Sequence, residues 1–207
     1  MTLLYLNLLI YMFFLIYQFT TYKKRESTIY IEIAISMLLL VLTFMFAITG
    51  ISPLSGLQLR QHGVFNLIPS HGIGIIMRCP NNIFRIKNIL GNIIMFMPIG
   101  FLLPIIWCKY KNIYRCTIFG MLLSVSIEIM QMPLSRGTDI DDVILNTFGT
   151  VLGYGVYVII RDRHNDILEL FEDNKRLYCP IKLILMFLLS IVVLGFIILI
   201  KGMFFYE

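Results

Sequence analysis

Several polar residues that could do chemistry stand inside otherwise apolar segments of this chain. Glu128 lies well inside the apolar segment Cys116–Met132, and an ionisable group there is energetically costly and therefore a functional candidate. Ser124, Glu128 and Gln131 are spaced i, i+4 and i+7, which places all three on one helix face. We expect this face to point into a helix bundle, with Arg136 as the nearest cation for the carboxylate. A purely structural tether between Glu128 and Arg136 is the competing interpretation.

A second polar group opens the next apolar segment. Asp139, Asp142 and Asn146 are spaced i, i+3 and i+7, and glycines follow at 149 and 153. Asp139 could be no more than a helix cap, since carboxylates are favoured in a first helical turn. The spacing of Asp142 and Asn146 continues along the same face, and the two glycines allow another helix to approach closely. We therefore predict that this polar stripe packs against a neighbouring helix.

The segment before these two supplies a third polar group. Asn88 and Asn92 lie one turn apart on one face, and Pro98 and Pro104 are expected to kink the helix that follows them. Together the three groups can line one outward-opening pocket at the level of the lipid headgroups. Its predicted residues are Asn88, Asn92, Glu128, Gln131, Arg136, Asp139, Asp142 and Asn146.

The residue types limit what such a pocket could bind. The planar guanidinium of Arg136 suits a phosphate or carboxylate, whereas the carboxylates suit an amine, a sugar hydroxyl or a divalent cation. Glu128 or Asp142 could act as a general acid or base, and Asp139, Asp142 and Glu128 could hold a divalent metal. The sequence contains no metal-spaced His pair, nucleophile elbow or P-loop, which disfavours an enzyme. We predict no cofactor other than such a divalent cation.

The elements that must position these residues are membrane-spanning helices. The chain has 207 residues, of which 58% are hydrophobic and 14% charged, and about 20 apolar residues in a helix cross a membrane. We predict an all-α, polytopic transmembrane helix bundle of six spans, or five if the first or last does not cross. The predicted spans are Leu3–Thr20, Ile29–Thr49, Ile89–Trp107, Cys116–Met132, Val143–Ile160 and Ile181–Ile200. The first lacks a basic n-region and a cleavage site, so we expect it to be retained.

Charge in the loops predicts the orientation. One set of loops carries eleven Lys and Arg residues and the other carries six, which favours both termini outside. The basic residues fall in short clusters between apolar runs, a pattern typical of membrane surfaces and not of nucleic-acid binding. We therefore predict a multi-pass protein of the cell membrane whose polar motifs face the extracytoplasmic side. The four cysteines lack metal-binding or redox spacing and are expected to be packing residues.

The segment Ser52–Lys87 separates the second span from the third. It keeps apolar residues throughout and is broken by four glycines and three prolines, so we predict an interfacial or partly re-entrant loop. This gives a predicted division into two helices over residues 1–50, a core over 51–160, and a cytoplasmic linker with a last helix over 161–207.

Several phrases resemble the VanZ-like family of membrane proteins. They are NLIP at Asn66–Pro69, the pattern N-x-x-x-F-x-P-x-G-x-x-L-P at Asn92–Pro104, E-x-x-Q at Glu128 and Gln131, and RGTDIDDVILNTFG from Arg136 to Gly149. The resemblance covers about Phe65 to Tyr157. Family members usually carry a basic residue before NLIP, a place that Arg60 or His62 could fill, and an aromatic residue after it, where this chain has Ser70.

The resemblance has implications for both site and function. It adds Asn66 to the site, so the predicted ligand-binding residues are Asn66, Asn92, Glu128, Gln131, Arg136, Asp139, Asp142 and Asn146. It also implies a link to resistance against teicoplanin, a lipoglycopeptide that binds cell-wall precursors outside the membrane. Our first interpretation is a membrane factor that binds an envelope lipid, a precursor or the antibiotic. The alternatives are an enzyme acting on a phospho- or glycolipid headgroup and, third, a transporter or flippase.

Overall fold

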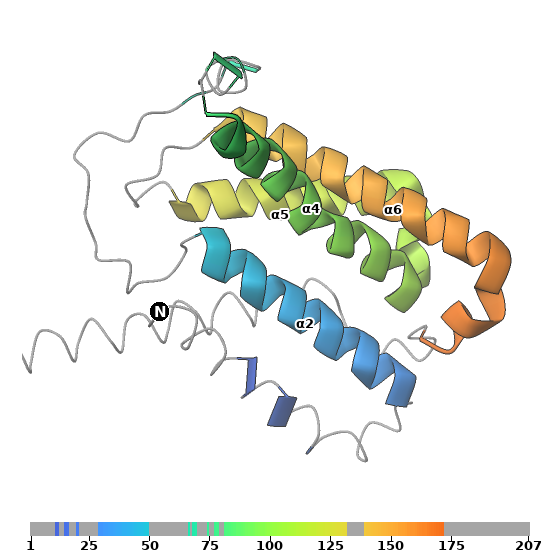
Figure 1. The fold of residues 1–207 in the computed structure, drawn as a ribbon. Coiled ribbons are helices and arrows are strands. Elements are labelled where there is room, and N and C mark those ends of the chain that lie inside the picture. Colours follow the sequence, from blue (N-terminus) through green and yellow to red (C-terminus); the bar gives the residue numbers. More distant parts are fainter. Residues whose placement is uncertain are drawn as a thin grey trace, which may run out of the picture. The chain divides into compact units, whose positions relative to one another are not determined.

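The computed structural model of the chain describes residues 11–12, 15–16, 20, 29–49, 66, 68–69, 74, 77–78, 81–131 and 139–171. The chain divides into two compact units, one of residues 1–59 with 173–207 and one of residues 60–172. The described residues are helical apart from turns and one isolated bridge between Asn66 and Asp139. Figure 1 shows the labelled helices of both units.

In the first unit, α2 spans Ile29–Thr49. Its sequence is apolar almost throughout, so a helix of this length satisfies its own backbone hydrogen bonds in lipid. The hydroxyl groups of Thr43 and Thr49 donate hydrogen bonds to backbone carbonyls one turn earlier, so these polar side chains are also satisfied within the helix. Glu32 is buried, with 7% of its surface exposed. From the position of Glu32 near the start of α2, the sequence predicts that its side chain extends toward Lys23 or Arg25. Both cations lie outside the described residues, so that pairing stays a prediction.

The second unit contains α4 over Asn82–Ile106, the short 3₁₀ helix η1 over Cys108–Lys111, α5 over Ile113–Gln131 and α6 over Ile140–Glu169. Helix α5 begins where Asn112 Oδ1 accepts hydrogen bonds from the backbone N–H groups of Tyr114 and Arg115. Near its end, α6 is interrupted at His164, whose φ of −141° and ψ of 42° are not helical. Short connections thus return the chain between α4, α5 and α6.

Glycines bring α4 and α6 into backbone contact. A Cβ atom added at Gly149 would lie 2.2 Å from the Ile93 carbonyl oxygen, and one added at Gly153 would lie 1.9 Å from that of Met97. The contact is reciprocal, because a Cβ at Gly100 would meet the Thr150 carbonyl oxygen. Later residues of α4 meet later residues of α6, so the two helices run parallel. The close approach predicted at the 149–153 spacing is confirmed.

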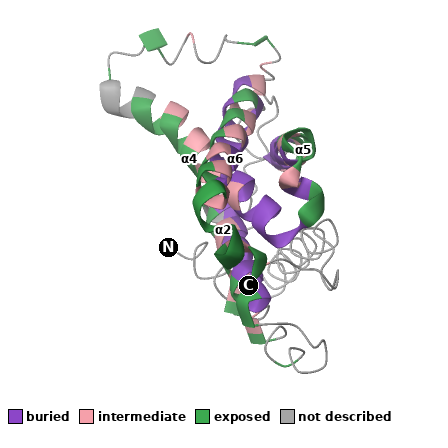
Figure 2. Cartoon of the chain, turned by 90° about the vertical axis from the view of Figure 1, so that its right-hand side faces the viewer, coloured by how far each residue is buried: buried purple, intermediate pink, exposed green. Residues whose placement is uncertain are grey.

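Helix α5 runs antiparallel to α6. Gly120 packs against the Thr150 side chain, whereas Ser124, later on α5, contacts Asn146, earlier on α6. Each of α4, α5 and α6 has a buried and an exposed side, as Figure 2 shows in purple and green. The exposed side carries large apolar residues such as Ile94, Leu122 and Phe148, as expected for helices surrounded by lipid.

The prolines of α4 lie inside one continuous helix. Proline has no N–H, so Pro104 cannot bond the carbonyl of Gly100 four residues earlier. That carbonyl instead accepts a hydrogen bond from the buried thiol of Cys116 on α5, at a sulfur–oxygen distance of 3.7 Å. Cys116 therefore packs as predicted and also satisfies a carbonyl released by proline. For Cys108, which is exposed, the prediction of a packing residue is wrong. The predicted kink stays a prediction.

Among the described residues, α2, α4, α5 and α6 are long and apolar enough to cross a membrane. They correspond to the second to fifth predicted spans, and the boundaries of α2 agree with the prediction. Helices α4 and α5 begin before the predicted segments and end one residue short of them, whereas α6 extends beyond its segment at both ends. Spans Leu3–Thr20 and Ile181–Ile200 fall almost wholly outside the described residues, so the count of six stays a prediction. The same holds for the interfacial loop and for the division at residues 50 and 160.

Candidate functional site

The candidate site is built at one end of the second unit, where α4 and α6 begin and α5 ends. Asn66 belongs to the segment before α4 and pairs with Asp139, the residue that caps α6. Asn66 Nδ2 donates to Asp139 Oδ1 at 2.9 Å, and the Ile140 N–H donates to the Asn66 carbonyl at 3.0 Å. The loop residue is thereby fixed to the start of α6 by both its side chain and its backbone.

Asp139 is a helix cap, as one interpretation of the sequence predicted. Its Oδ1 also accepts from the Asp141 N–H at 2.9 Å, and its extended backbone is typical of a cap. Both hydrogen bonds at this carboxylate use Oδ1 and none among the described residues uses Oδ2. The capping residue therefore joins the loop to α6 and keeps acceptor capacity.

Glu128 reaches the same cap from α5. Its Oε2 accepts a hydrogen bond from the Asp139 N–H at 3.0 Å, and only 4% of its surface is exposed. Asp142 lies close enough for its carboxylate to interact electrostatically with that of Glu128. Ser124 and Gln131, the other members of the predicted inward face, are also buried, at 0% and 6% exposure. That prediction is confirmed.

Asn92 connects α4 to the site. Its Nδ2 donates to Asp142 Oδ1 at 2.6 Å, so an amide donor from α4 meets a carboxylate acceptor from α6. The polar stripe of α6 therefore packs against a neighbouring helix, as predicted. Asp142 and Asn146 contact different helices, because Asn146, one turn further along α6, bonds Ser124 on α5.

Asn146 forms the innermost polar contact of the site. Its Nδ2 donates to the Ser124 hydroxyl oxygen at 2.8 Å, and 2% of Asn146 is exposed. Its Oδ1 is buried without a hydrogen-bond partner among the described residues. A buried acceptor in this state is costly and is normally satisfied by water or a ligand.

Six of the eight predicted ligand-binding residues thus form hydrogen bonds in three groups: Asn66 and Glu128 with Asp139, Asn92 with Asp142, and Asn146 with Ser124. Gln131 lies buried on the same face of α5 as Glu128. Arg136 lies outside the described residues, so its pairing with Glu128 and its place in the site stay predictions. Within the part of the chain that is described, no three His, Cys, Asp or Glu side chains are grouped as a metal-binding set. The predicted roles of the residues, including the outward-opening pocket, also stay predictions.

Sequence reasoning missed Asp141. This residue is almost fully buried, with 2% exposure, whereas the predicted Asp142 is only half-buried. The i, i+3, i+7 spacing identifies the residues on one face of α6, which include Asp142 but not Asp141. Because α6 has neighbours on more than one side, a residue outside that face can also be buried. The signal that the sequence offered was an acidic residue in the first turn of α6.

Comparison with known proteins shows the family to which this chain belongs. Protein VanZ of Enterococcus faecium is 38% identical to this chain over 74 residues, which are 34% of this chain and 44% of that protein, so the match spans less than half of the relative. No solved structure matches the chain. The VanZ/LLP1 family model matches residues 2–161, a range that contains every predicted site residue. This apolar, helical membrane protein therefore belongs to the VanZ/LLP1 family.

Proposed function

We propose that the protein binds the polar headgroup of an envelope lipid or cell-wall precursor at this site. The observation that carries the proposal is the convergence of loop, α4, α5 and α6 at the start of α6. There Asn66 and Glu128 bond Asp139, and Asn92 bonds Asp142. Polar groups gathered at one end of a membrane bundle are at the depth of lipid headgroups. The site is therefore suited to a ligand that remains in the membrane.

The acceptors of the site indicate what part of the ligand would be recognised. Asp139 keeps an oxygen without a hydrogen bond in the described part of the chain, and Asn146 keeps a buried amide oxygen. Such groups recognise donors, for example an ammonium group or sugar hydroxyls. Both kinds of donor occur in the headgroups of envelope lipids and precursors.

We further propose that binding lowers the sensitivity of the cell to teicoplanin, as the family resemblance implies. The distribution of Lys and Arg supports an orientation in which the site faces outside, where the antibiotic meets its target. The same surface could bind the lipoglycopeptide itself. In each case the protein acts without breaking a bond.

The experiment is expression of the full chain in a teicoplanin-susceptible Gram-positive host. We expect a higher inhibitory concentration for teicoplanin, with lipid extracts and cell-wall precursors chemically unchanged. Asp162→Asn, an exposed change at the opposite end of α6, is the matched control and should behave as wild type. Unchanged teicoplanin sensitivity at a normal protein level would contradict the proposal.

An enzyme acting on a phospho- or glycolipid headgroup is the second candidate function. It is favoured by the position of Glu128, a buried carboxylate that interacts electrostatically with Asp142, since two such groups can serve as acid and base. The same extracts distinguish the two functions. A new or missing lipid or precursor species that depends on Glu128 would support the enzyme and exclude binding alone.

A further inference from the structure

A cluster of cations lies at the end of the second unit opposite the candidate site. Residues 107–115, which connect α4 to α5 and which we call the basic turn, contain Lys109, Lys111 and Arg115 and no acidic residue. The candidate site lies where α4 begins and α5 ends, whereas the basic turn lies where α4 ends and α5 begins. The two features are therefore separated by the length of the helices.

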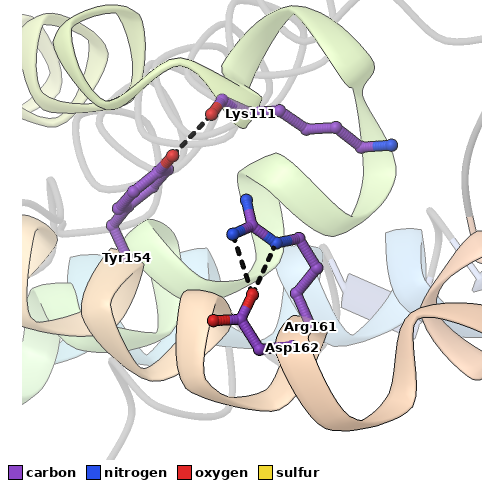
Figure 3. A network of polar contacts seen from close by, with 4 residues as sticks. All are labelled: Lys111, Tyr154, Arg161 and Asp162. Carbon is purple, nitrogen blue, oxygen red and sulfur yellow. Dashed lines mark hydrogen bonds and ion pairs between the residues drawn. The ribbon is translucent and has the colours of Figure 1, made fainter.

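The backbone of the basic turn is held in place. The Tyr110 N–H donates to the Trp107 carbonyl at 2.9 Å, and the Tyr154 hydroxyl on α6 donates to the Lys111 carbonyl. Figure 3 shows this second contact, with the Lys111 side chain extending away from it. The Tyr110 ring is buried edge-on between Trp107 and Phe119. The cations are thus carried on a preorganised turn, which lowers the entropy lost on binding.

Two of these cations, Lys109 and Arg115, are exposed. Lys109 lies with its Nζ 4.8 Å from the centre of the Tyr110 ring, and Arg115 stands in the first turn of α5. Neither forms an ion pair with a carboxylate among the described residues. Arg161 differs, because Asp162 already neutralises it at 2.9 Å (Figure 3). The start of α5 adds the positive end of its helix dipole to Lys109 and Arg115.

Apolar side chains stand directly beside these charges. Tyr114 is 75% exposed, and Ile113 and Ile118 are also exposed. Exposed tyrosines at the end of a membrane helix lie at the level of the headgroups, and exposed isoleucines there contact acyl chains. A ligand that matches both parts of this surface carries a negative headgroup and apolar chains. A soluble anion would match only the cations.

We propose that the basic turn binds the phosphate of an anionic phospholipid from the leaflet at this end of the bundle. Lys109 and Arg115 contact the phosphate, Tyr114 lies beside the headgroup, and the isoleucines contact the chains. This interaction does not depend on the function proposed for the opposite end. It gives the protein a lipid preference set by named residues.

The experiment measures lipid retention by the full-length protein. The protein is purified from mixed phosphatidylglycerol and phosphatidylcholine in detergent, and bound lipids are counted by native mass spectrometry. Wild type should retain phosphatidylglycerol in excess. A large molar excess of inorganic phosphate should not displace this lipid, because phosphate has no acyl chains to contact the isoleucines. Each cation near a membrane surface contributes roughly 5-fold, so Lys109→Gln with Arg115→Gln should reduce the preference about 25-fold.

Two further variants keep the result interpretable. Arg78→Gln with Lys87→Gln removes two exposed cations from the opposite end and should leave the preference unchanged. Lys109→Arg with Arg115→Lys keeps both charges and should retain the preference even if the glutamine variant proves unstable. The proposal would be overturned if the Arg78 and Lys87 variant lost as much lipid preference as the Lys109→Gln, Arg115→Gln variant. It would also be overturned if the Lys109→Gln, Arg115→Gln variant kept the wild-type preference. Neither result depends on teicoplanin, so this proposal and the proposed function fail separately.

Discussion

At the residue scale, the candidate site consists of amide donors matched to carboxylate acceptors. Asn66 donates to Asp139 and Asn92 donates to Asp142, while Glu128 accepts from a backbone N–H. Hydrogen bonds to ionised groups are about twice as strong as neutral ones, so these contacts contribute to folding as well as to any binding. Tests at single residues must therefore separate the charge of a side chain from its hydrogen bond.

Glu128→Gln makes this separation. Glutamine has nearly the same shape and can still accept from the Asp139 N–H, but it carries no charge and cannot exchange a proton. If the charge is needed, the variant should reach the membrane at a normal level and lose the teicoplanin phenotype. Immunoblots of membranes and inhibitory concentrations measure the two effects.

Arg136→Gln in the same background is the control for the structural interpretation. If Glu128 serves only as a tether for Arg136, the double variant should recover the protein level and much of the activity, because neither charge remains buried alone. If the charge is functional, the double variant should fold and remain inactive. A fully active Glu128→Gln protein would remove Glu128 as acid, base or metal ligand.

The Ser124 and Asn146 pair gives a prediction about stability. Ser124→Ala leaves the Asn146 Nδ2 without its acceptor, beside an Oδ1 that has no donor in the described part of the chain. The loss of a partner from a buried polar group should lower the free energy of unfolding by about 1–3 kcal/mol. Adding Asn146→Leu removes both polar atoms and should recover most of this loss. Thermal unfolding in detergent of both variants and of Asn146→Leu alone completes the double-mutant cycle.

At the element scale, the parallel packing of α4 and α6 depends on glycines that contact backbone. Gly153→Ala should place a methyl group against the Met97 carbonyl oxygen and force the helices apart, at a cost of about 1–3 kcal/mol or more. Gly155→Ala, two residues later, is the matched control, because nothing lies within 4 Å of its added Cβ. We expect a lower melting temperature for the first variant and no decrease for the second. Equal effects would show that helix propensity, and not packing, governs this segment.

The packing of α4 against α6 also determines the geometry of the site. Asn92 lies on α4 and Asp142 on α6, and their 2.6 Å hydrogen bond requires the axial position that the glycines permit. A variant that separates the helices should therefore weaken function without touching a polar residue. This consequence distinguishes a site built on rigid elements from one built on loops.

At the scale of the whole molecule, the orientation in the membrane that loop charges predict can be tested by thiol labelling. Cys108 is exposed and Cys116 is buried. In intact cells a membrane-impermeant reagent should leave both unlabelled, and after permeabilisation it should label Cys108 alone. A single cysteine introduced by Arg78→Cys, at the end where α4 begins, should be labelled in intact cells. Cys79 should also be labelled in intact cells if its side chain is accessible. Labelling of Cys108 or Cys179 from outside would show that the predicted orientation is wrong.

Much of the fold could be predicted from the sequence because helix formation in lipid depends on local composition. An apolar stretch such as Ile29–Thr49 must satisfy its backbone within itself, so its length and position follow directly from its residues. The inward face of α5 was predicted from the 3.6-residue helix period. The close helix approach at the glycine pair of α6 was predicted because glycine has no side chain. These properties belong to single segments.

Tertiary structure decided which segments meet. The period of α6 places Asp142 and Asn146 on one stripe, but only the packing assigns the first to Asn92 on α4 and the second to Ser124 on α5. The bridge between Asn66 and Asp139 joins residues that are distant in the sequence, and the burial of Asp141 needs neighbours on a second side of the helix. A hydrogen bond between two helices depends on their separation, direction and axial shift, and none of these is encoded in the period of either helix alone.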